Sequence, residues 1–346
     1  MKRSLWMSIL LMLILMISAC GKASEPASTE DEKETKETEA NISGTIQFYT
    51  SQPDTDVTEL VNGFNAKYPD VEVKVFRSGT EEVIGKLLAE KQAGSIQADV
   101  LLVADSVTFE NLKEQDLLMP YESKELSEIP SEFVDNEHMY TGTKVMATVL
   151  AVNTEKVKEL PSSWNTLTEA SSKDKSIMPS PLYSGAAAYN VGVISRQSDF
   201  GWDFYQKLRD NNITVVQGNG AALKAVASGE KEFGMVVDFI VARSKKEGSP
   251  IDLVYPKEGV PVITEPIGIM KNTKNEAASK AFVDFVLSEE GQALANKLGY
   301  TPIRKGMDAP EGLKTIDELN VLSSPIDELL KTREDDKMRF KELLGE

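Results

Sequence analysis

The chain has 346 residues and a formal net charge of −17 at pH 7, from 55 acidic and 38 basic side chains. This acidic balance argues against a nucleic-acid partner, which would require a basic face. Cys20 is the only cysteine and His138 the only histidine. Disulfides and thiolate metal sites are thereby excluded after residue 20. With one histidine, a Ser-His-Asp triad has little support, and so has a multi-histidine zinc site.

The first 19 residues have the pattern of an export signal. Lys2 and Arg3 precede an apolar run over residues 5–17, which is too short to span a bilayer. Residues 16–21, MISACG, then resemble the lipobox of bacterial lipoproteins, in which cleavage occurs before the cysteine and its sulfur carries a diacylglycerol. We expect residues 1–19 to be a lipoprotein signal peptide and Cys20 to be lipidated. The alternatives are a secretory leader with a chance cysteine and a short transmembrane anchor.

Residues 20–43 predict a disordered acidic tether, because they hold almost no large apolar side chain to offset the entropy of ordering. Together with Cys20 this predicts an exported protein, lipid-anchored at the outer face of a bacterial cell membrane. If the source is Gram-negative, the protein would face the periplasm.

From residue 44 the chain alternates strand and helix patterns. Strands are expected over 45–50, 71–76 and 99–103, each followed by a polar turn and a helix, which indicates a doubly wound α/β unit. In such sheets ligands bind beyond the carboxyl ends of the strands. The turns therefore supply candidate ligand-binding residues: Ser51, Gln52, Ser78, Gly79, Thr80, Asp105 and Ser106. Each is also an ordinary helix N-cap type, so a purely structural role stays open.

A second α/β unit is expected from about residue 149, with strands over 149–153, 213–217 and 233–237. Ser184 and Gly185 open an alanine-rich helix whose free backbone amides would suit an anion, and a capped helix without ligand is the alternative. The candidate ligand-binding residues of this unit are Tyr183, Ser184, Gly185, Ala186, Asn219 and Asp238.

The chain then returns through a strand expected over 266–270, a long helix over 277–298 and a helical tail over 316–344. We expect residues 44–148 and 265–346 to form lobe 1 and residues 149–264 to form lobe 2. Two units joined by two crossings would leave a ligand cleft between the lobes.

Several of these segments resemble the extracellular solute-binding proteins of bacterial ABC importers. They are residues 48–51 (FYTS), 79–80 (GT), 98–100 (ADV), 181–189, 227–230 (ASGE), 255–259 (YPKEG) and 281–292. The resemblance implies the two-lobed type II periplasmic-binding-protein fold, in the branch of ferric-iron, 2-aminoethylphosphonate and hexose-phosphate binders. The implied partners are a small-molecule or ion ligand and an ABC permease with its ATPase. We expect a monomer, without a cofactor.

The choice of ligand depends on the site residues. Ferric-binding relatives use adjacent tyrosines in the second lobe, whereas residues 236–243 read VVDFIVAR without such a pair. A phosphonate or a phosphate-bearing compound suits the helix start at Ser184, with Asp238 or Asp105 available to pair with an amine. The alternative is ferric iron held by Tyr183, Tyr189 and Asp238. We expect His138 to be a surface or interlobe residue and not a ligand.

An enzyme is not expected, because Ser184 lacks a histidine partner and Ser184-Gly185-Ala186 is not a nucleophile elbow. A ligand-sensing or adhesive lipoprotein would keep the same fold without transport, and stays open as a further alternative.

Overall fold

A computed structural model describes residues 42–345, which belong to one compact unit, Asn41–Glu346. The predicted signal peptide, Cys20 and nearly all of the predicted tether lie outside the described residues. The strands are β1 Gly44–Thr50, β2 Val71–Arg77, β3 Val100–Leu102, β4 Leu118–Met119, β5 Thr141–Asn153, β6 Ser176–Pro179, β7 Thr214–Val216, β8 Phe233–Val237, β9 Ile251–Val254, β10 Val260–Met270, β11 Thr301–Pro302 and β12 Val321–Leu322. The α-helices are α1 Asp54–Lys67, α2 Thr80–Gln92, α3 Ser106–Glu114, α4 Gly185–Ile194, α5 Gly201–Asp210, α6 Asn219–Ala227, α7 Asp238–Lys246, α8 Glu276–Leu287, α9 Glu289–Lys297 and α10 Ile326–Leu344.

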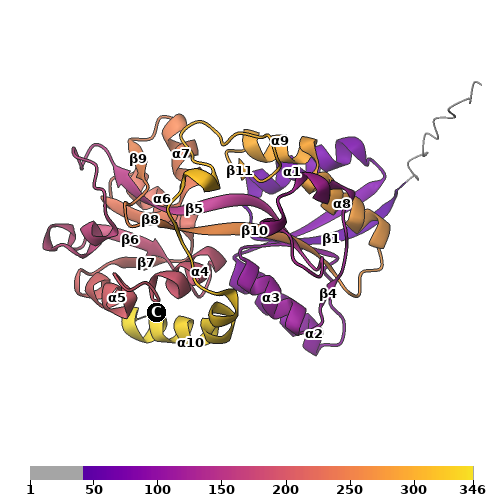
Figure 1. Ribbon diagram of the computed structural model, residues 1–346, viewed down its shortest axis with the longest axis horizontal. Coiled ribbons are helices and arrows are strands. Elements are labelled where there is room, and N and C mark those ends of the chain that lie inside the picture. Colours follow the sequence, from indigo (N-terminus) through magenta and orange to yellow (C-terminus); the bar gives the residue numbers. More distant parts are fainter. Residues whose placement is uncertain (1–41, 346) are drawn as a thin grey trace, which may run out of the picture. The chain divides into compact units, whose positions relative to one another are not determined.

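The first half of the sheet consists of β1, β2 and β3, which run parallel in the order β2-β1-β3. Each of these strands leads into a helix, as the alternation of strand and helix patterns predicted. Figure 1 shows α2 and α3 on one side of these strands, and α1 with α8 and α9 on the other. This is a doubly wound unit with helices on both faces of a parallel sheet.

The second half repeats the arrangement with β6, β7 and β8, which run parallel in the order β8-β6-β7. In both halves the strand that comes first in the chain lies in the middle of its set. The strands β6, β7 and β8 lead into α4, α6 and α7 respectively. The two halves are therefore similar units, as the sequence pattern predicted.

The long strands β5 and β10 join the two halves. They pair antiparallel with each other, while β10 also pairs with β3 of the first half and β5 also pairs with β8 of the second. The β5–β10 register shifts between Thr264 and Pro266. Such a β-bulge re-aims the side chains beside it, and the carboxylate of Glu265 is at this point.

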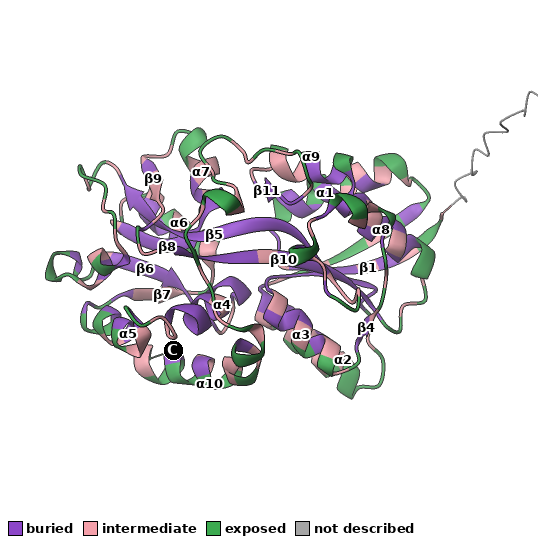
Figure 2. Ribbon diagram, viewed as in Figure 1, coloured by how far each residue is buried: buried purple, intermediate pink, exposed green. Residues whose placement is uncertain are grey.

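The core of each half is apolar, and that of the first half consists of two clusters. Residues 149–152 of β5 are fully buried, as a strand covered on both faces should be. In the first half the rings of Phe48 and Phe64 both pack on Phe282, with centroid distances of 4.8 and 4.9 Å. Figure 2 shows the central strands buried and the outer faces of the helices exposed. No helix between residues 42 and 345 has both the length and the apolar character needed to cross a membrane.

Four expected elements have clearly different bounds in the structure. The helix expected over 277–298 is two helices, because Ser288 ends α8 and its side chain then accepts the backbone amide of Gly291 in α9. The tail helix begins only at Ile326, after Pro325, since residues 316–318 form a short 3₁₀ turn. The crossing strands are also longer than expected, because β5 starts at Thr141 and β10 at Val260.

Candidate functional site

A cavity of about 330 Å³ lies where the two halves of the sheet face each other. Its walls come from the segments that follow β1, β2 and β3 in one half and β6, β7 and β8 in the other. The lining residues are Ser51, Gln52, Pro53, Arg77, Gly79, Thr80, Ala104, Met146, Tyr183, Ser184, Ala186, Gln217, Gly218, Asn219, Gly220, Ala221, Val237, Phe239, Ile240, Glu265 and Tyr300. The carboxyl ends of six parallel strands thus converge on one cavity, which is where ligands bind in sheets of this type.

Five helices begin at the wall of this cavity. The N-caps or first-turn residues of α1, α2, α4, α6 and α7 all line it. The first amides of a helix have no partner within the helix, and its N-terminus carries a partial positive charge of about half a unit. Five such ends around one space favour an anion.

Free backbone amides are present at two of these helix starts. Within residues 42–345, the amides of Ala186 in α4 and of Asn219 and Gly220 in α6 have no hydrogen-bond partner. All three residues line the cavity. They are donors placed where an oxyanion can accept from them without competition from other protein groups.

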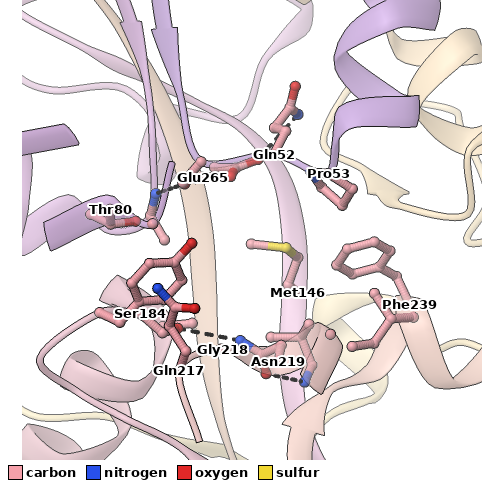
Figure 3. Close-up of a pocket in the computed structure, with 18 of the residues that line it drawn as sticks. Gln52, Pro53, Thr80, Met146, Ser184, Gln217, Gly218, Asn219, Phe239 and Glu265 are labelled. Atoms are coloured by element: carbon pink, nitrogen blue, oxygen red, sulfur yellow. Dashed lines mark hydrogen bonds between the residues drawn. The ribbon is translucent and has the colours of Figure 1, made fainter. Parts of the chain in front are cut away.

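The side chains of Ser184 and Asn219 tie three helix starts together. The hydroxyl oxygen of Ser184 accepts from the amide of Ala187 and from Nδ2 of Asn219, both at 3.3 Å. Oδ1 of Asn219 accepts from the amide of Val237 at 3.1 Å. Figure 3 shows this chain of hydrogen bonds along one side of the cavity. Since Ser184 only accepts in these contacts, its hydroxyl proton stays available to a ligand.

Glu265 is the only acid among the described residues that line the cavity. One of its carboxylate oxygens lies 2.6 Å from Nζ of Lys144 and accepts from Nε2 of Gln52 at 3.2 Å. The side chains of Glu265 and Lys144 are both almost fully buried, at 5% and 4% exposure. A carboxylate paired so closely adds no net negative charge to the wall, but its oxygens still accept hydrogen bonds.

Arg77 is the only basic residue among the described lining residues. Its Nε donates to the carbonyl oxygen of Gln52 at 2.7 Å, which fixes the side chain beside the start of α1. Between residues 42 and 345, neither terminal amino group of Arg77 has a hydrogen-bond partner. A guanidinium with free donors at the cavity wall is suited to a charged oxygen of a ligand.

Another part of the wall is apolar. The rings of Phe239 and Tyr300 stack with centroids 4.1 Å apart, and Ile240 and Met146 extend the surface. Figure 3 places Phe239 on the side of the cavity opposite Ser184, with Met146 toward the middle of the view. The cavity therefore combines a polar end rich in donors with an apolar end that would contact the carbon skeleton of a ligand.

The structure brings eight of the predicted residues to the cavity wall: Ser51, Gln52, Gly79, Thr80, Tyr183, Ser184, Ala186 and Asn219. Ser78, Asp105, Ser106, Gly185 and Asp238 do not line it. The hydroxyl of Ser78 donates to Glu82, and Asp105 caps α3 and pairs with Arg333. Ser106 is the first residue of α3, and Gly185 faces the backbone of Ala104.

Asp238 is buried away from the cavity. It accepts from the hydroxyl of Tyr255 at 3.1 Å and from the amide of Phe239 at 2.8 Å. Burial raises the pKa of Asp238 to about 7, against an ordinary value of 3.8, although these donors act in the other direction. A carboxyl enclosed in this way has no room to meet a ligand amine.

The structure offers little to a metal ion at this place. No group of three or more His, Cys, Asp and Glu side chains within residues 42–345 is arranged to hold a metal. Tyr189 does not line the cavity, and burial raises its pKa to about 12, which opposes the phenolate form that ferric iron prefers. His138 lies in the loop before β5 and is also absent from the cavity wall.

The sequence reasoning missed Arg77, Gln217, Phe239, Ile240 and Glu265. Arg77 is the last residue of β2 and directly precedes the predicted ligand-binding turn at residues 78–80, so a prediction that included the last strand residue would contain Arg77. Phe239 and Ile240 directly follow Asp238, and the sequence analysis used this segment only to note that it lacks a tyrosine pair. Glu265 gave no signal, because its position depends on the bulge between two strands distant in sequence.

The sequence matches the family described as bacterial extracellular solute-binding protein over residues 59–319. A probable ABC transporter periplasmic-binding protein of Sinorhizobium fredii is 27% identical over 252 residues, which is 69% of each chain.

Among solved structures, the fold is similar to the fructose-6-phosphate-bound periplasmic binding protein AfuA of Actinobacillus pleuropneumoniae. The TM-score is 0.80 at 24% identity, over 87% of this chain and 98% of that one. Iron-bound HitA of Pseudomonas aeruginosa gives a TM-score of 0.73 at 24% identity, over 86% and 99%. These likenesses confirm the predicted two-lobed type II periplasmic-binding-protein fold.

Proposed function

The chain belongs to the bacterial extracellular solute-binding proteins, and we propose that it captures a small organic compound bearing a phosphoryl or phosphonyl group in the cavity between its lobes. The family consists of binding proteins that serve ABC importers, and not of enzymes. The predicted role of the protein as a solute-binding component of an importer is therefore confirmed. The partners of the protein are a small solute and a membrane permease.

The observation that carries the choice of ligand is the convergence of five helix N-termini on one cavity. Free amides of Ala186, Asn219 and Gly220 and the hydroxyl of Ser184 supply four donors within two adjacent helix starts. This donor set suits a tetrahedral oxyanion. The apolar wall at Phe239 and the carboxylate of Glu265 are then left for the organic part of the ligand.

The same wall disfavours ferric iron, the alternative ligand. Phe239 and Ile240 line the cavity within the segment where the resemblance to ferric-binding proteins would lead us to expect adjacent tyrosines. Apolar side chains give a hard trivalent cation no oxygen to bind. Similarity in fold to iron-bound HitA does not supply the missing donors.

We further propose that the protein is a monomer anchored at the outer face of the membrane by lipid on Cys20. Residues 20–43 would hold the two lobes away from the bilayer. The proposed lobes are residues 44–148 with 265–346 and residues 149–264, so that β5 and β10 contain the hinges. Closure of such lobes around a ligand is a hinge movement of whole domains.

The test of the ligand is calorimetry with fructose 6-phosphate, 2-aminoethylphosphonate, inorganic phosphate and ferric citrate. We expect heat with at least one of the first two compounds, and no visible absorption band with ferric citrate. Asn219→Asp should weaken binding of that compound at least about tenfold, because a carboxylate would then face the oxyanion. Asn62→Asp makes the same change on an exposed face of α1 and serves as control.

Two outcomes would reject the proposal. One is heat only with ferric citrate, together with a visible charge-transfer band that Tyr183→Phe removes. The other is equal affinity of the Asn219→Asp and Asn62→Asp variants for the phosphoryl or phosphonyl compound, which would place the ligand away from the helix starts.

A further inference from the structure

The C-terminal helix α10 packs mainly on α4 and α5 of the second lobe, and Val107 of α3 in the first lobe joins the buried apolar cluster around Leu329. The side chain of Leu329 packs on Gly192 of α4 so closely that a Cβ at Gly192 would lie 2.8 Å from it. Phe340 is fully buried, and its ring lies 5.9 Å from that of Tyr205 in α5. Figure 1 shows α10 running along α4 and α5. The proposed division by sequence places residues 265–346 in lobe 1, whereas this packing favours α10 moving with lobe 2.

The same helix directs two cations toward the first lobe. The guanidinium of Arg333 lies 2.9 Å from Oδ2 of Asp105 and 2.9 Å from Oε1 of Glu81. One turn further along, Nζ of Lys337 lies 2.7 Å from Oε2 of Glu81. Positions four apart lie on one face of a helix, so this face of α10 pairs with α2 and with the start of α3.

These ion pairs are largely removed from water. The side chains of Arg333, Glu81 and Asp105 are 10%, 16% and 1% exposed. Burial would raise the pKa of Glu81, but the charges of Arg333 and Lys337 outweigh it and hold that pKa below its ordinary value. The pairs therefore differ from surface salt bridges, whose net contribution is small.

The acids of this cluster lie directly behind the cavity wall. Glu81 follows Thr80, and Asp105 follows Ala104, and both of these neighbours line the cavity. The amide of Glu81 also donates to the carbonyl oxygen of Tyr183 in the other lobe, at 3.2 Å. The cluster thus holds two cavity-lining turns of lobe 1 against the segment that opens α4.

We propose that Arg333 and Lys337 are positioning residues for ligand binding, which pair with Glu81 and Asp105 when the lobes close and so stabilise the closed form without touching the ligand. Opening of the cleft would carry α10 away with lobe 2 and expose all four charges to water. Hydration would then offset much of the lost attraction. The pairs consequently set the balance between open and closed forms, and the apparent dissociation constant varies inversely with the closed fraction.

The proposal is tested by two measurements. The first, ligand affinity, rests on the proposed function, whereas the second, small-angle scattering without ligand, does not. Arg333→Met removes the charge while keeping most of the side-chain volume, and Lys331→Met makes the same change at an exposed position of α10 without an ion pair in residues 42–345. We expect Arg333→Met to bind fructose 6-phosphate at least about tenfold more weakly than Lys331→Met. Arg333→Lys should recover part of the affinity, because one of the two ion pairs can re-form.

The second arm is small-angle scattering of the ligand-free protein, in which Arg333→Met should show a larger radius of gyration than Lys331→Met. Glu81→Gln breaks the cluster from the opposite lobe and should give the same expansion, which keeps the test valid if Arg333→Met fails to fold. Equal affinity, or equal radii of the cluster variants and Lys331→Met, would overturn the proposal. If the wild type gives no heat with fructose 6-phosphate, the proposed ligand class loses its support, and the scattering arm alone decides on α10.

Discussion

Gly185 lies at a close contact between the two proposed lobes, and replacing it tests whether binding requires this contact. A Cβ built on Gly185 would lie 2.5 Å from the carbonyl oxygen of Ala104 and 2.9 Å from Cγ2 of Thr80. Ala104 and Thr80 belong to the proposed lobe 1, whereas Gly185 is the first residue of α4 in the proposed lobe 2. Since real Cβ atoms do not approach a backbone oxygen so closely, Gly185→Ala must move the lobes apart.

The expected cost follows from this geometry. Overfilling a packed contact costs about 1–3 kcal/mol, which corresponds to roughly 5- to 150-fold in a dissociation constant. The cost falls on the closed form alone, because opening the cleft removes the contact with Ala104. Ligand affinity should therefore drop by this factor while the unfolding temperature of the ligand-free protein changes little.

Calorimetry and small-angle scattering together provide the assay. Gly185→Ala should bind the ligand more weakly and show less compaction on binding than the wild type. Gly85→Ala is the matched control, because a Cβ there, in the middle of α2, meets nothing within 4 Å. If Gly185→Ala binds and compacts like Gly85→Ala, the lobes do not meet at Gly185 in the ligand-bound form, and the reasoning fails.

Two further predictions concern a buried acid and the membrane anchor. Because burial raises the pKa of Asp238 to about 7 from 3.8, the folded protein keeps a proton that the unfolded chain releases. As the pH rises from about 4 to 7, the free energy of unfolding therefore falls by on the order of 4 kcal/mol, a contribution that is fully present below the pKa of Asp238 in the unfolded chain. Urea unfolding across this range should show a flatter dependence of this free energy on pH for Asp238→Asn than for the wild type, and the same slope for both would contradict the burial argument. Cys20→Ser should abolish incorporation of labelled palmitate, since no other cysteine exists to accept lipid; unchanged labelling would exclude the proposed anchor.

The sequence predicted the fold well where local pattern determines local structure. Short apolar strands such as residues 233–237, followed by polar turns and amphipathic helices, specify a doubly wound sheet without knowledge of distant contacts. Element ends were less predictable. The break at Ser288 depends on a side-chain hydrogen bond and on the close approach of Gly291 to the carbonyl oxygen of Phe285, and neither is visible as a periodicity.

The cavity residues likewise divide into those that the local sequence predicts and those that distant contacts place. Ser184 and Asn219, which line the cavity, could be predicted because helix starts at strand ends carry a recognisable residue pattern. Glu265 was missed because a bulge between β5 and β10 places it, and that register joins residues more than a hundred positions apart. Gly185 was predicted as a ligand-binding residue but does not line the cavity, because the carbonyl group of Ala104 lies against it.

The proposed anion site also explains how a chain with a net charge of −17 can attract a negatively charged solute. At physiological ionic strength, salt screens the electric field of the net charge beyond about 8 Å. The cavity wall carries the partial positive ends of five helices, the guanidinium of Arg77, which lies 4.0 Å from the exposed carboxylate of Asp54, and the carboxylate of Glu265, which is paired with Lys144. A high net charge favours solubility in general, whereas the helix ends at the cavity supply the partial positive charge that the proposed anionic ligand requires.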